Sequence, residues 1–290
     1  MVLNKLRPWA PPATENMDSR FLEEVVGALF PGAANEEDGR FTEKEEQEPQ
    51  PPEEESRDTA GSWNPESRVI EEELAEAVGS IGARKAPGPD GVTSRLWKDV
   101  VGVSAPRLMR LFDGCLSQGE FPVSWKEGRM VLLPKPGRSP DLPSAFRPVC
   151  LLDEAGKLLE RVVAARLESH LSRRGRFTAD AVARVRSLVE GAERRGCVAL
   201  AVWLDVVNAF NSNPCDRICR TLEFHRVPAY LRGVVRAFLR DRSIVYTVRG
   251  GGMTGRAVYR GVPQGSVLGP SCGASCTRRY FGRRCLRTRH

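Results

Sequence analysis

The sequence predicts a mixed fold of the α+β class, with α/β as the related possibility. Segments in which apolar residues recur at helical spacing alternate with short apolar runs of strand length, and no internal repeat is present. Two segments carry the prediction. After Asp153, apolar residues recur at helical spacing over about five turns, and residues 197–204 form an unbroken apolar run that ends at Asp205. A run of that kind is typical of a strand buried on both faces.

The first 68 residues differ from the rest of the chain. They contain 7 Lys and Arg against 16 Asp and Glu, and residues 35–68 combine acidic residues with proline. So few apolar residues cannot offset the entropy lost on ordering, which predicts a disordered linker. Residues 1–34 form a short segment before it. Within that segment, residues 19–30 can make one amphipathic helix, but they carry no chemical group that suggests a function.

The first elements of the body follow the linker. Residues 71–81 are predicted to form a helix that stops at Gly82, and residues 128–135 contain a short buried strand that Pro134 ends. A loop rich in Pro, Gly and Ser leads to a second apolar segment, and Asp153 can cap the long helix after it. The apolar face of that helix consists of Leu158, Leu159, Val162, Val163, Leu167 and Leu171.

The second half of the body continues the alternation. The predicted strand of residues 197–205 is followed by a helix in which Pro214 can be the first residue, because a proline there loses no needed N–H group. A further helix over residues 229–240 leads into a strand over residues 244–248. We expect one body over residues 69–270 and a separate tail rich in Arg and Cys over residues 271–290.

The charge of the body favours a polyanionic partner. Residues 69–270 contain 31 basic against 21 acidic residues, and the tail adds six Arg and no acid. Neutralised phosphates release counterions, so a basic body suits nucleic acid, although many soluble proteins are equally basic. No apolar stretch reaches 18 residues and no signal core follows Met1, which predicts an intracellular protein of nucleus or cytoplasm, neither secreted nor membrane-bound.

The eight cysteines predict neither a disulfide framework nor a zinc site. The sequence contains no CxxC pair, and we expect reduced thiols. In the tail, the spacing of Cys272, Cys276, Cys285 and His290 matches no common zinc finger.

Four segments carry a more specific signal. They are residues 86–91 (APGPDG), residues 133–137 with 146–153 (LPKPG and FRPVCLLD), residues 204–212 (LDVVNAFNS) and residues 261–270 (GVPQGSVLGP). In this order they resemble the successive fingers and palm motifs of non-LTR retrotransposon reverse transcriptases. The resemblance covers roughly residues 69–270 and is far more specific than a single motif. It implies a partial right-hand polymerase fold, with fingers and an incomplete palm and with the thumb absent. It also implies an RNA template, a DNA primer and dNTP as partners, and it leaves the oligomeric state open.

The resemblance makes Asp205 the first metal-binding aspartate of the palm. Nucleotide addition is an in-line displacement at phosphorus, in which two Mg²⁺ ions stabilise the attacking and leaving oxygens. A carboxylate at the end of a buried strand is a suitable ligand for a hard cation, and the backbone carbonyl of Val206 stands next to it. The alternative is that Asp205 only caps the next helix.

The same resemblance assigns residues to the incoming nucleotide. Phe210 matches the aromatic steric gate that selects deoxynucleotides, and Gln264 matches a residue that lines the nucleotide pocket. Lys135 and Arg147 match the pair that holds the triphosphate, for which a guanidinium fork is well suited. The alternatives are an ordinary core Phe, a plain turn and solvated surface charges.

The resemblance also assigns residues to the template and primer. Lys85 and Asp90 belong to a fingers loop that would touch them, and Gly265 would let the backbone approach the base pair. Without the motif, both segments would be plain turns.

Two departures from the family pattern limit what the resemblance implies. The segment that contacts the template in the family is reduced here to residues 174–181. No Asp or Glu follows Asp241, so the family's paired aspartates are missing from these residues and one incomplete metal site remains. Catalysis by this polypeptide is therefore expected to be absent. The alternatives are a fragment that binds RNA or DNA without catalysis and a decayed element without activity.

Overall fold

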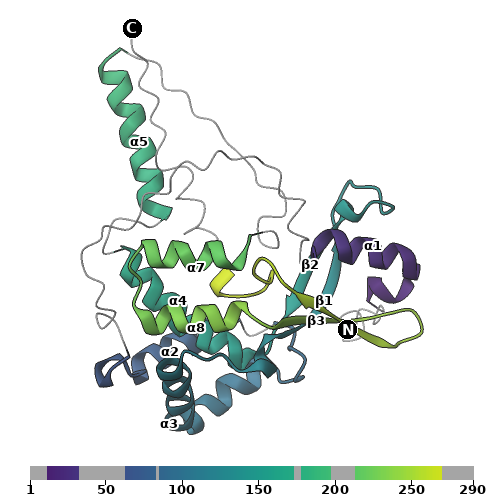
Figure 1. Cartoon of the computed structure of the whole chain (residues 1–290), viewed down its shortest axis with the longest axis horizontal. Coiled ribbons are helices and arrows are strands. Elements are labelled where there is room, and N and C mark those ends of the chain that lie inside the picture. Colours follow the sequence, from purple (N-terminus) through teal and green to yellow (C-terminus); the bar gives the residue numbers. More distant parts are fainter. Residues whose placement is uncertain (1–11, 33–62, 83–84, 173–177, 197–212, 270–290) are drawn as a thin grey trace, which may run out of the picture.

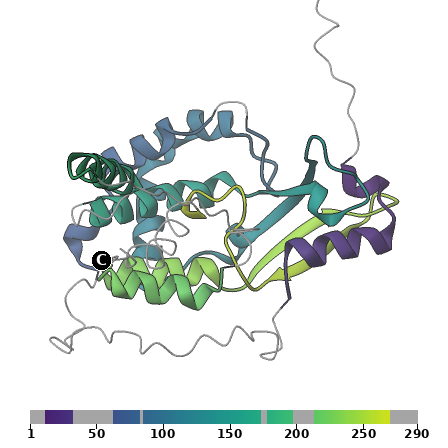
Figure 2. The ribbon, with the colours of Figure 1, turned by 90° about the horizontal axis from the view of Figure 1, so that it is seen from above.

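The computed structural model describes residues 12–32, 63–82, 85–172, 178–196 and 213–269 of the 290-residue chain. A sheet lies at one end of the molecule and a cluster of helices at the other (Figures 1 and 2). The helices are α1 (Ser19–Leu29), α2 (Glu71–Gly79), α3 (Ser94–Gln118), α4 (Glu154–Ser172), α5 (Thr178–Arg194), α7 (Cys215–Phe224) and α8 (Ala229–Leu239). The strands are β1 (Glu127–Pro134), β2 (Phe146–Leu151), β3 (Arg242–Thr247) and β4 (Met253–Val258).

The four strands form one sheet in the order β2-β1-β3-β4. Strands β1 and β2 make an antiparallel hairpin in which Leu133 pairs with Arg147, and β3 and β4 make a second antiparallel hairpin. The two hairpins join where β1 and β3 run parallel over residues 127–129 and 243–245. This junction places β2 at one edge of the sheet.

Helix α1 covers one face of the sheet. Asp18 caps the helix by accepting the backbone N–H groups of Arg20 and Phe21 at 3.0 and 3.3 Å. The apolar face of α1 packs on the inward residues of all four strands, and the ring of Phe21 meets that of Phe146 edge to face at 6.3 Å. The helix that the sequence predicts near the N-terminus therefore exists, and it completes the core of the sheet.

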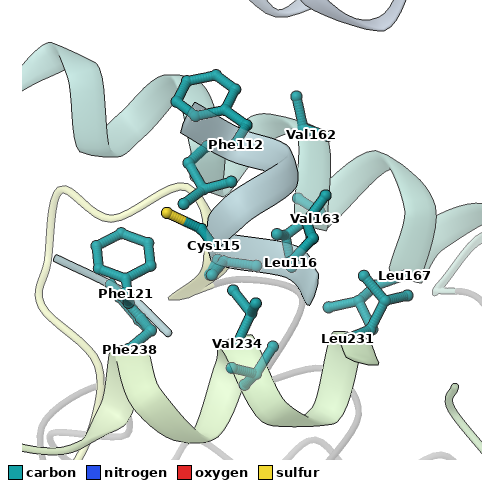
Figure 3. Close-up of a cluster of buried hydrophobic side chains, with 14 of the residues drawn as sticks. Phe112, Cys115, Leu116, Phe121, Val162, Val163, Leu167, Leu231, Val234 and Phe238 are labelled. Atoms are coloured by element: carbon teal, nitrogen blue, oxygen red, sulfur yellow. The ribbon is translucent and has the colours of Figure 1, made fainter. Parts of the chain in front are cut away.

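The second core lies between α3, α4 and α8 (Figure 3). Phe112 and Leu116 of α3 are fully buried, and the rings of Phe121 and Phe238 contact each other edge to face at 5.2 Å. Val162, Val163 and Leu167 of α4 and Leu231 and Val234 of α8 point into the same space in Figure 3. Burial of these side chains supplies the main stabilisation of the helical part.

An ion pair joins α2 to α4 at the edge of this core. The guanidinium of Arg166 donates to both carboxylate oxygens of Glu73 at 2.7 Å, and it also donates to the backbone oxygens of Ser67 and Arg68. The pair is mostly shielded from water, because the exposed fractions of the two side chains are 13% and 24%. A paired fork of this kind fixes the orientation of the two helices.

The described residues confirm a mixed α and β fold and most of the predicted elements. Helices α1, α2, α4 and α8 and strands β1 and β3 lie where the sequence predicts them, within a few residues. The helix predicted to begin at Pro214 begins one residue later, with Pro214 as its cap. The predicted strand of residues 197–205 lies outside the described residues.

Helix α3, helix α5 and strand β4 were not predicted. Helix α3 runs for 25 residues across Pro106, and a proline inside a helix removes one hydrogen bond, so the sequence reads as two broken halves. Strand β4 contains a glycine and little β-branched sequence, and it forms because β3 supplies its partner groups. In Figure 1, α5 extends away from the other helices.

Candidate functional site

The β1–β2 hairpin carries the two predicted triphosphate ligands. The backbone N–H of Lys135 donates to the carbonyl of Ala145 at 2.7 Å and closes the loop between the strands. The side chain of Lys135 is partly exposed, and its ammonium donates to the carbonyl of Ser144 at 2.9 Å. An ammonium has three protons, so this contact leaves donors for a phosphate. Lys135 therefore lies at the loop end of the hairpin with part of its side chain accessible to a ligand.

Arg147 lies on the open face of the sheet. Its neighbours Phe146 and Pro148 are buried on the α1 side, and side chains alternate along a strand, so Arg147 points to the opposite side. Leu133, its cross-strand partner, is 47% exposed. The guanidinium thus faces solvent beside apolar side chains, which suits a ligand with phosphates and a base.

The turn of residues 263–266 packs against the edge of β2. The backbone N–H of Cys150 donates to the carbonyl of Gln264 at 2.7 Å, and the N–H of Ser266 donates to the carbonyl of Pro263 at 3.0 Å. Gln264 and Arg147 belong to segments far apart in sequence, yet the hydrogen bond brings Gln264 to a position three residues from Arg147 along β2, about 10 Å away. The structure therefore brings together two residues that were both predicted to contact the nucleotide.

Gly265 makes this approach possible. Its φ of +127° is strained for a residue with a side chain, and a Cβ atom there would collide with the backbone carbonyl oxygen of Cys150. The sequence predicted that Gly265 lets backbone approach the base pair. In the structure, the backbone that it approaches is β2.

The start of this loop is held by the buried side chain of Arg242 and by the backbone of Asn213, and Lys126 binds the end of the neighbouring helix α8. Arg242 donates to the carbonyl of Gly261 at 2.6 Å and to that of Leu239 at 3.1 Å, and Lys126 donates to the carbonyl of Ala237 at 3.3 Å. The last carbonyls of a helix have no partner within it, so both cations satisfy the C-terminus of α8. The N–H of Gly261 donates to the carbonyl of Asn213, eight residues after Asp205.

The end of the loop is held by Glu160 of α4, which is 1% exposed. One of its oxygens, Oε2, accepts the hydroxyl of Ser266 at 2.6 Å and the backbone N–H groups of Val267 and Leu268 at 2.7 and 3.0 Å. Burial raises the pKa of Glu160, while the three donors and the charge of Lys157 act to lower it. Three donors on one oxygen fit the ionised carboxylate.

The loop of residues 85–91 packs against the two residues that follow β2, at the same end of the strand as Cys150. Gly88 touches Leu152 and Asp153 so closely that a Cβ atom has no room. The carboxylate of Asp153 accepts the backbone N–H of Asp90 at 3.0 Å, and the carboxylate of Asp90 accepts the N–H of Val92 at 2.9 Å. Burial raises the pKa of Asp153, although its hydrogen bond to the Asp90 backbone lowers it. Asp153 therefore stands at the predicted cap position and also anchors the loop.

The predicted residues divide into two groups. The first group lies in the described part of the chain and consists of Lys85, Asp90, Lys135, Arg147, Gln264 and Gly265. All of these flank or contact β2 or the residues that directly follow it, except Lys85, which is exposed at the start of its loop. Asp205, Val206 and Phe210 lie outside the described residues. Within residues 12–32, 63–82, 85–172, 178–196 and 213–269, no group of three or more His, Cys, Asp and Glu is arranged to hold a metal ion.

Comparison with known proteins decides the family. The family of reverse transcriptases (RNA-dependent DNA polymerases) matches residues 133–283, which is just over half of the chain. The chain belongs to the reverse transcriptase family. The match includes β2, the turn of residues 263–266 and the segment with Asp205.

Several relatives of this reverse transcriptase chain come from non-LTR retrotransposons of Drosophila melanogaster. The probable RNA-directed DNA polymerase from transposon BS is 30% identical over 211 residues, which are 69% of this chain and 23% of that protein. The RNA-directed DNA polymerase from mobile element jockey is 28% identical over 223 residues, which are 71% of this chain and 24% of that protein. A putative 115 kDa protein in the type-1 retrotransposable element R1DM is 32% identical over 216 residues, 68% of this chain and 20% of that protein. The chain spans about a quarter or less of their length.

Two further residues lie on or beside these segments and were not singled out from the sequence. Glu160 gives a weak signal in retrospect, because it interrupts the apolar face of α4 between Leu159 and Val162. Arg129 lies on the same face of β1 as Leu133 and is exposed on the central part of the sheet, beside Leu151 and Val245 of the neighbouring strands. No motif marks Arg129, and only the sheet register shows that it shares a face with Arg147.

None of the helices in the described part of the chain is both long and apolar enough to span a membrane.

Proposed function

We propose that residues 69–270 form the fingers and the first part of the palm of an RNA-directed DNA polymerase, and that the open face beside β2 binds the incoming dNTP and the template-primer duplex. The observation that carries the proposal is the hydrogen bond from the N–H of Cys150 to the carbonyl of Gln264, which joins the fingers strand to the predicted nucleotide-pocket turn. The names of the relatives, which are polymerases of mobile elements, support the same assignment.

The proposed roles follow from the chemistry of the side chains. Arg147 and Lys135 would bind the triphosphate, because a guanidinium fork and an ammonium both suit phosphate oxygens. Gln264 would contact the nucleotide from the turn, and Lys85 with the loop of Asp90 and the backbone at Gly265 would face template or primer. Phe210 would exclude a ribose 2′-hydroxyl. The described residues among them flank or contact β2 or its continuation, except Lys85, and the role of Phe210 rests on the motif alone.

The reaction of the family adds a nucleotide by attack of the primer 3′-hydroxyl on the α-phosphorus of dNTP, with loss of pyrophosphate. Two Mg²⁺ ions bound at the palm would stabilise the charge on the attacking and leaving oxygens. From this chain we assign the carboxylate of Asp205 and the backbone carbonyl of Val206 as metal ligands. Both assignments rest on the motif of residues 204–212.

We further propose that the polypeptide of residues 1–290, tested by itself, binds substrates but does not polymerise. Residues 242–290 contain no Asp or Glu, so the partners that the family supplies to Asp205 are not found among them. One carboxylate cannot hold two divalent ions in a dry site, and most of the stabilisation of the transition state would be lost. The basic balance of residues 69–270 is sufficient for binding of nucleic acid.

The binding half of the proposal is tested with a fluorescent RNA–DNA template-primer. We expect affinity to fall steeply between 50 and 200 mM salt, by roughly 10³-fold if about six phosphates are contacted. Arg147→Ala should weaken binding of Mg²⁺-dATP to the protein–duplex complex about tenfold, or about 1.4 kcal/mol. Arg186→Ala is the matched control, because Arg186 is an exposed arginine of α5 with an 82% exposed side chain. Equal affinities of the two variants would refute the site.

The catalytic half is tested by primer extension on poly-A template with oligo-dT. We expect no incorporation of dTTP by residues 1–290 under conditions in which a retroviral reverse transcriptase extends the primer. Mg²⁺-dependent incorporation that disappears in Asp205→Asn would contradict the proposed incompleteness and leave the polymerase assignment standing. Absence of both incorporation and salt-dependent binding would favour a decayed element without activity.

A further inference from the structure

Glu160 makes an unusual contact for a buried carboxylate. It lies on α4, yet its Oε2 accepts three donors from the segment that follows the turn of residues 263–266, more than 100 residues later. Two of the three donors are backbone N–H groups, and a buried N–H is costly to leave without a partner. Here α4 supplies that partner from a different part of the fold.

The energetics of the contact favour a positional role. A buried carboxylate is costly unless its hydrogen bonds are satisfied, and an apolar side chain of similar size would avoid that cost. On the same helix, the charge of Lys157, which is 8% exposed, acts on Glu160, and Lys157 and Arg161 both pair with Glu154. Glu160 therefore holds residues 266–268 by three hydrogen bonds, which an apolar residue at this position could not accept.

The attachment completes a clamp around Gln264. On one side, the N–H of Cys150 holds the carbonyl of Gln264, and this N–H points away from β1, out of the edge of the sheet. On the other side, Glu160 holds Ser266, whose N–H closes the turn on Pro263. The turn is thus fixed between the strand that carries Arg147 and the helix that anchors the second core.

We propose that Glu160 is a positioning residue that holds the turn of residues 263–266, and with it Gln264, against β2. The part of this role that concerns nucleotide binding rests on the proposed function above. Glu160 acts through the turn and does not itself reach the nucleotide. The proposal predicts that replacing Glu160 weakens the hydrogen bond of the Cys150 backbone N–H, although Glu160 does not contact Cys150.

The test is amide hydrogen exchange, measured residue by residue on residues 1–290. In Glu160→Gln, the charge-assisted bonds become neutral, so the amides of Val267 and Leu268 should exchange roughly 10- to 100-fold faster. The amide of Cys150 should accelerate with them, because its N–H donates to the carbonyl of Gln264 in that turn. If Glu160 stabilised only residues 266–268, Cys150 would be unchanged, and that result would overturn the positioning role.

Two control variants separate positioning from general destabilisation. Leu167→Ala opens a cavity in the second core, at a side chain that is 1% exposed, and should lower the melting temperature without accelerating Cys150 relative to the rest of β2. Glu76→Gln makes the same chemical change at an exposed position of α2 and should alter neither measurement. If Leu167→Ala accelerated Cys150 as much as Glu160→Gln does, the proposal would fail.

Nucleotide binding gives an independent second measurement. Glu160→Gln should weaken Mg²⁺-dATP binding to the protein–duplex complex about tenfold, while the control Glu76→Gln should not change it. Failure of the wild-type protein to bind dATP would refute the proposed function and not the clamp, which the exchange at Cys150 decides. Binding by Glu160→Gln equal to wild type would refute the link from the clamp to the nucleotide.

Discussion

Replacing Gly265 by alanine is the most direct test of the contact between the turn and β2. At φ of +127°, a residue with a Cβ atom is strained, and such backbone strain costs about 1–3 kcal/mol. The added Cβ atom also meets the carbonyl oxygen of Cys150, which is backbone and cannot rotate away. The turn must therefore move, and the hydrogen bond between Cys150 and Gln264 is lost, at about 0.5–1.5 kcal/mol. We expect a total loss of about 2–4 kcal/mol in the free energy of unfolding.

Gly251→Ala is the matched control for this prediction. Gly251 lies in the turn between β3 and β4 with φ of +80°, and nothing lies within 4 Å of the position of its Cβ atom. Its substitution should therefore cost only the backbone strain of a left-handed residue, about 1–2 kcal/mol. Both variants are measured by urea unfolding with linear extrapolation, together with amide exchange at Cys150. If both lost the same stability within about 0.5 kcal/mol, and Cys150 stayed protected in Gly265→Ala, the close approach of the turn to β2 would be refuted.

Three further predictions follow from the two cores and the open face. Leu22→Ala on α1, at a side chain that is 3% exposed, should lower the free energy of unfolding by about 2–5 kcal/mol in urea, and an unchanged value would mean that α1 does not pack on the sheet. Burial raises the pKa of Cys150 to about 12 and that of Cys115 to about 11, from 9.0 in the unfolded chain. The stability that these neutral thiols contribute is complete below pH 9 and is lost as the pH rises through 11 to 12, so unfolding measured from pH 8 to 11 should show a decline that Cys150→Ala reduces. Arg129→Gln should weaken duplex binding about tenfold at 100 mM salt, and binding equal to wild type would exclude Arg129 from the interface.

The sequence predicts those elements whose own residues determine them. Helix α4 was predicted because Leu158, Val162 and Leu171 repeat at helical spacing, and burial of that face is what stabilises the helix. Helix α3 was missed because Pro106 interrupts its pattern, and its stability comes from Phe112 and Leu116 in a core made by other helices. Whether such a segment forms a helix depends on its packing against other elements, and the local sequence pattern does not show that packing.

The site shows the same division. Arg147 and Gln264 were predicted as nucleotide ligands because they stand in motifs whose order along the chain is specific. Their roles stay a prediction, and the structure adds that Gln264 accepts a hydrogen bond from Cys150, three residues after Arg147. Glu160 was missed because its partners lie more than 100 residues away and nothing near it in sequence indicates them. Arg129 was missed because membership of a sheet face depends on register, which appears only when the strands are paired.

Strand β2 and its continuation explain why the described motifs belong together. Gly88 touches Leu152 and Asp153, Gly265 touches Cys150, and the two glycines stand in motifs about 175 residues apart. Glycine is required at both positions because a Cβ atom would collide with the chain at β2 or just after it. This requirement does not depend on a substrate. The described motifs therefore specify how two segments pack against one strand and its continuation. It follows that these motifs, and the packing that they encode, do not by themselves show that a chain polymerises DNA.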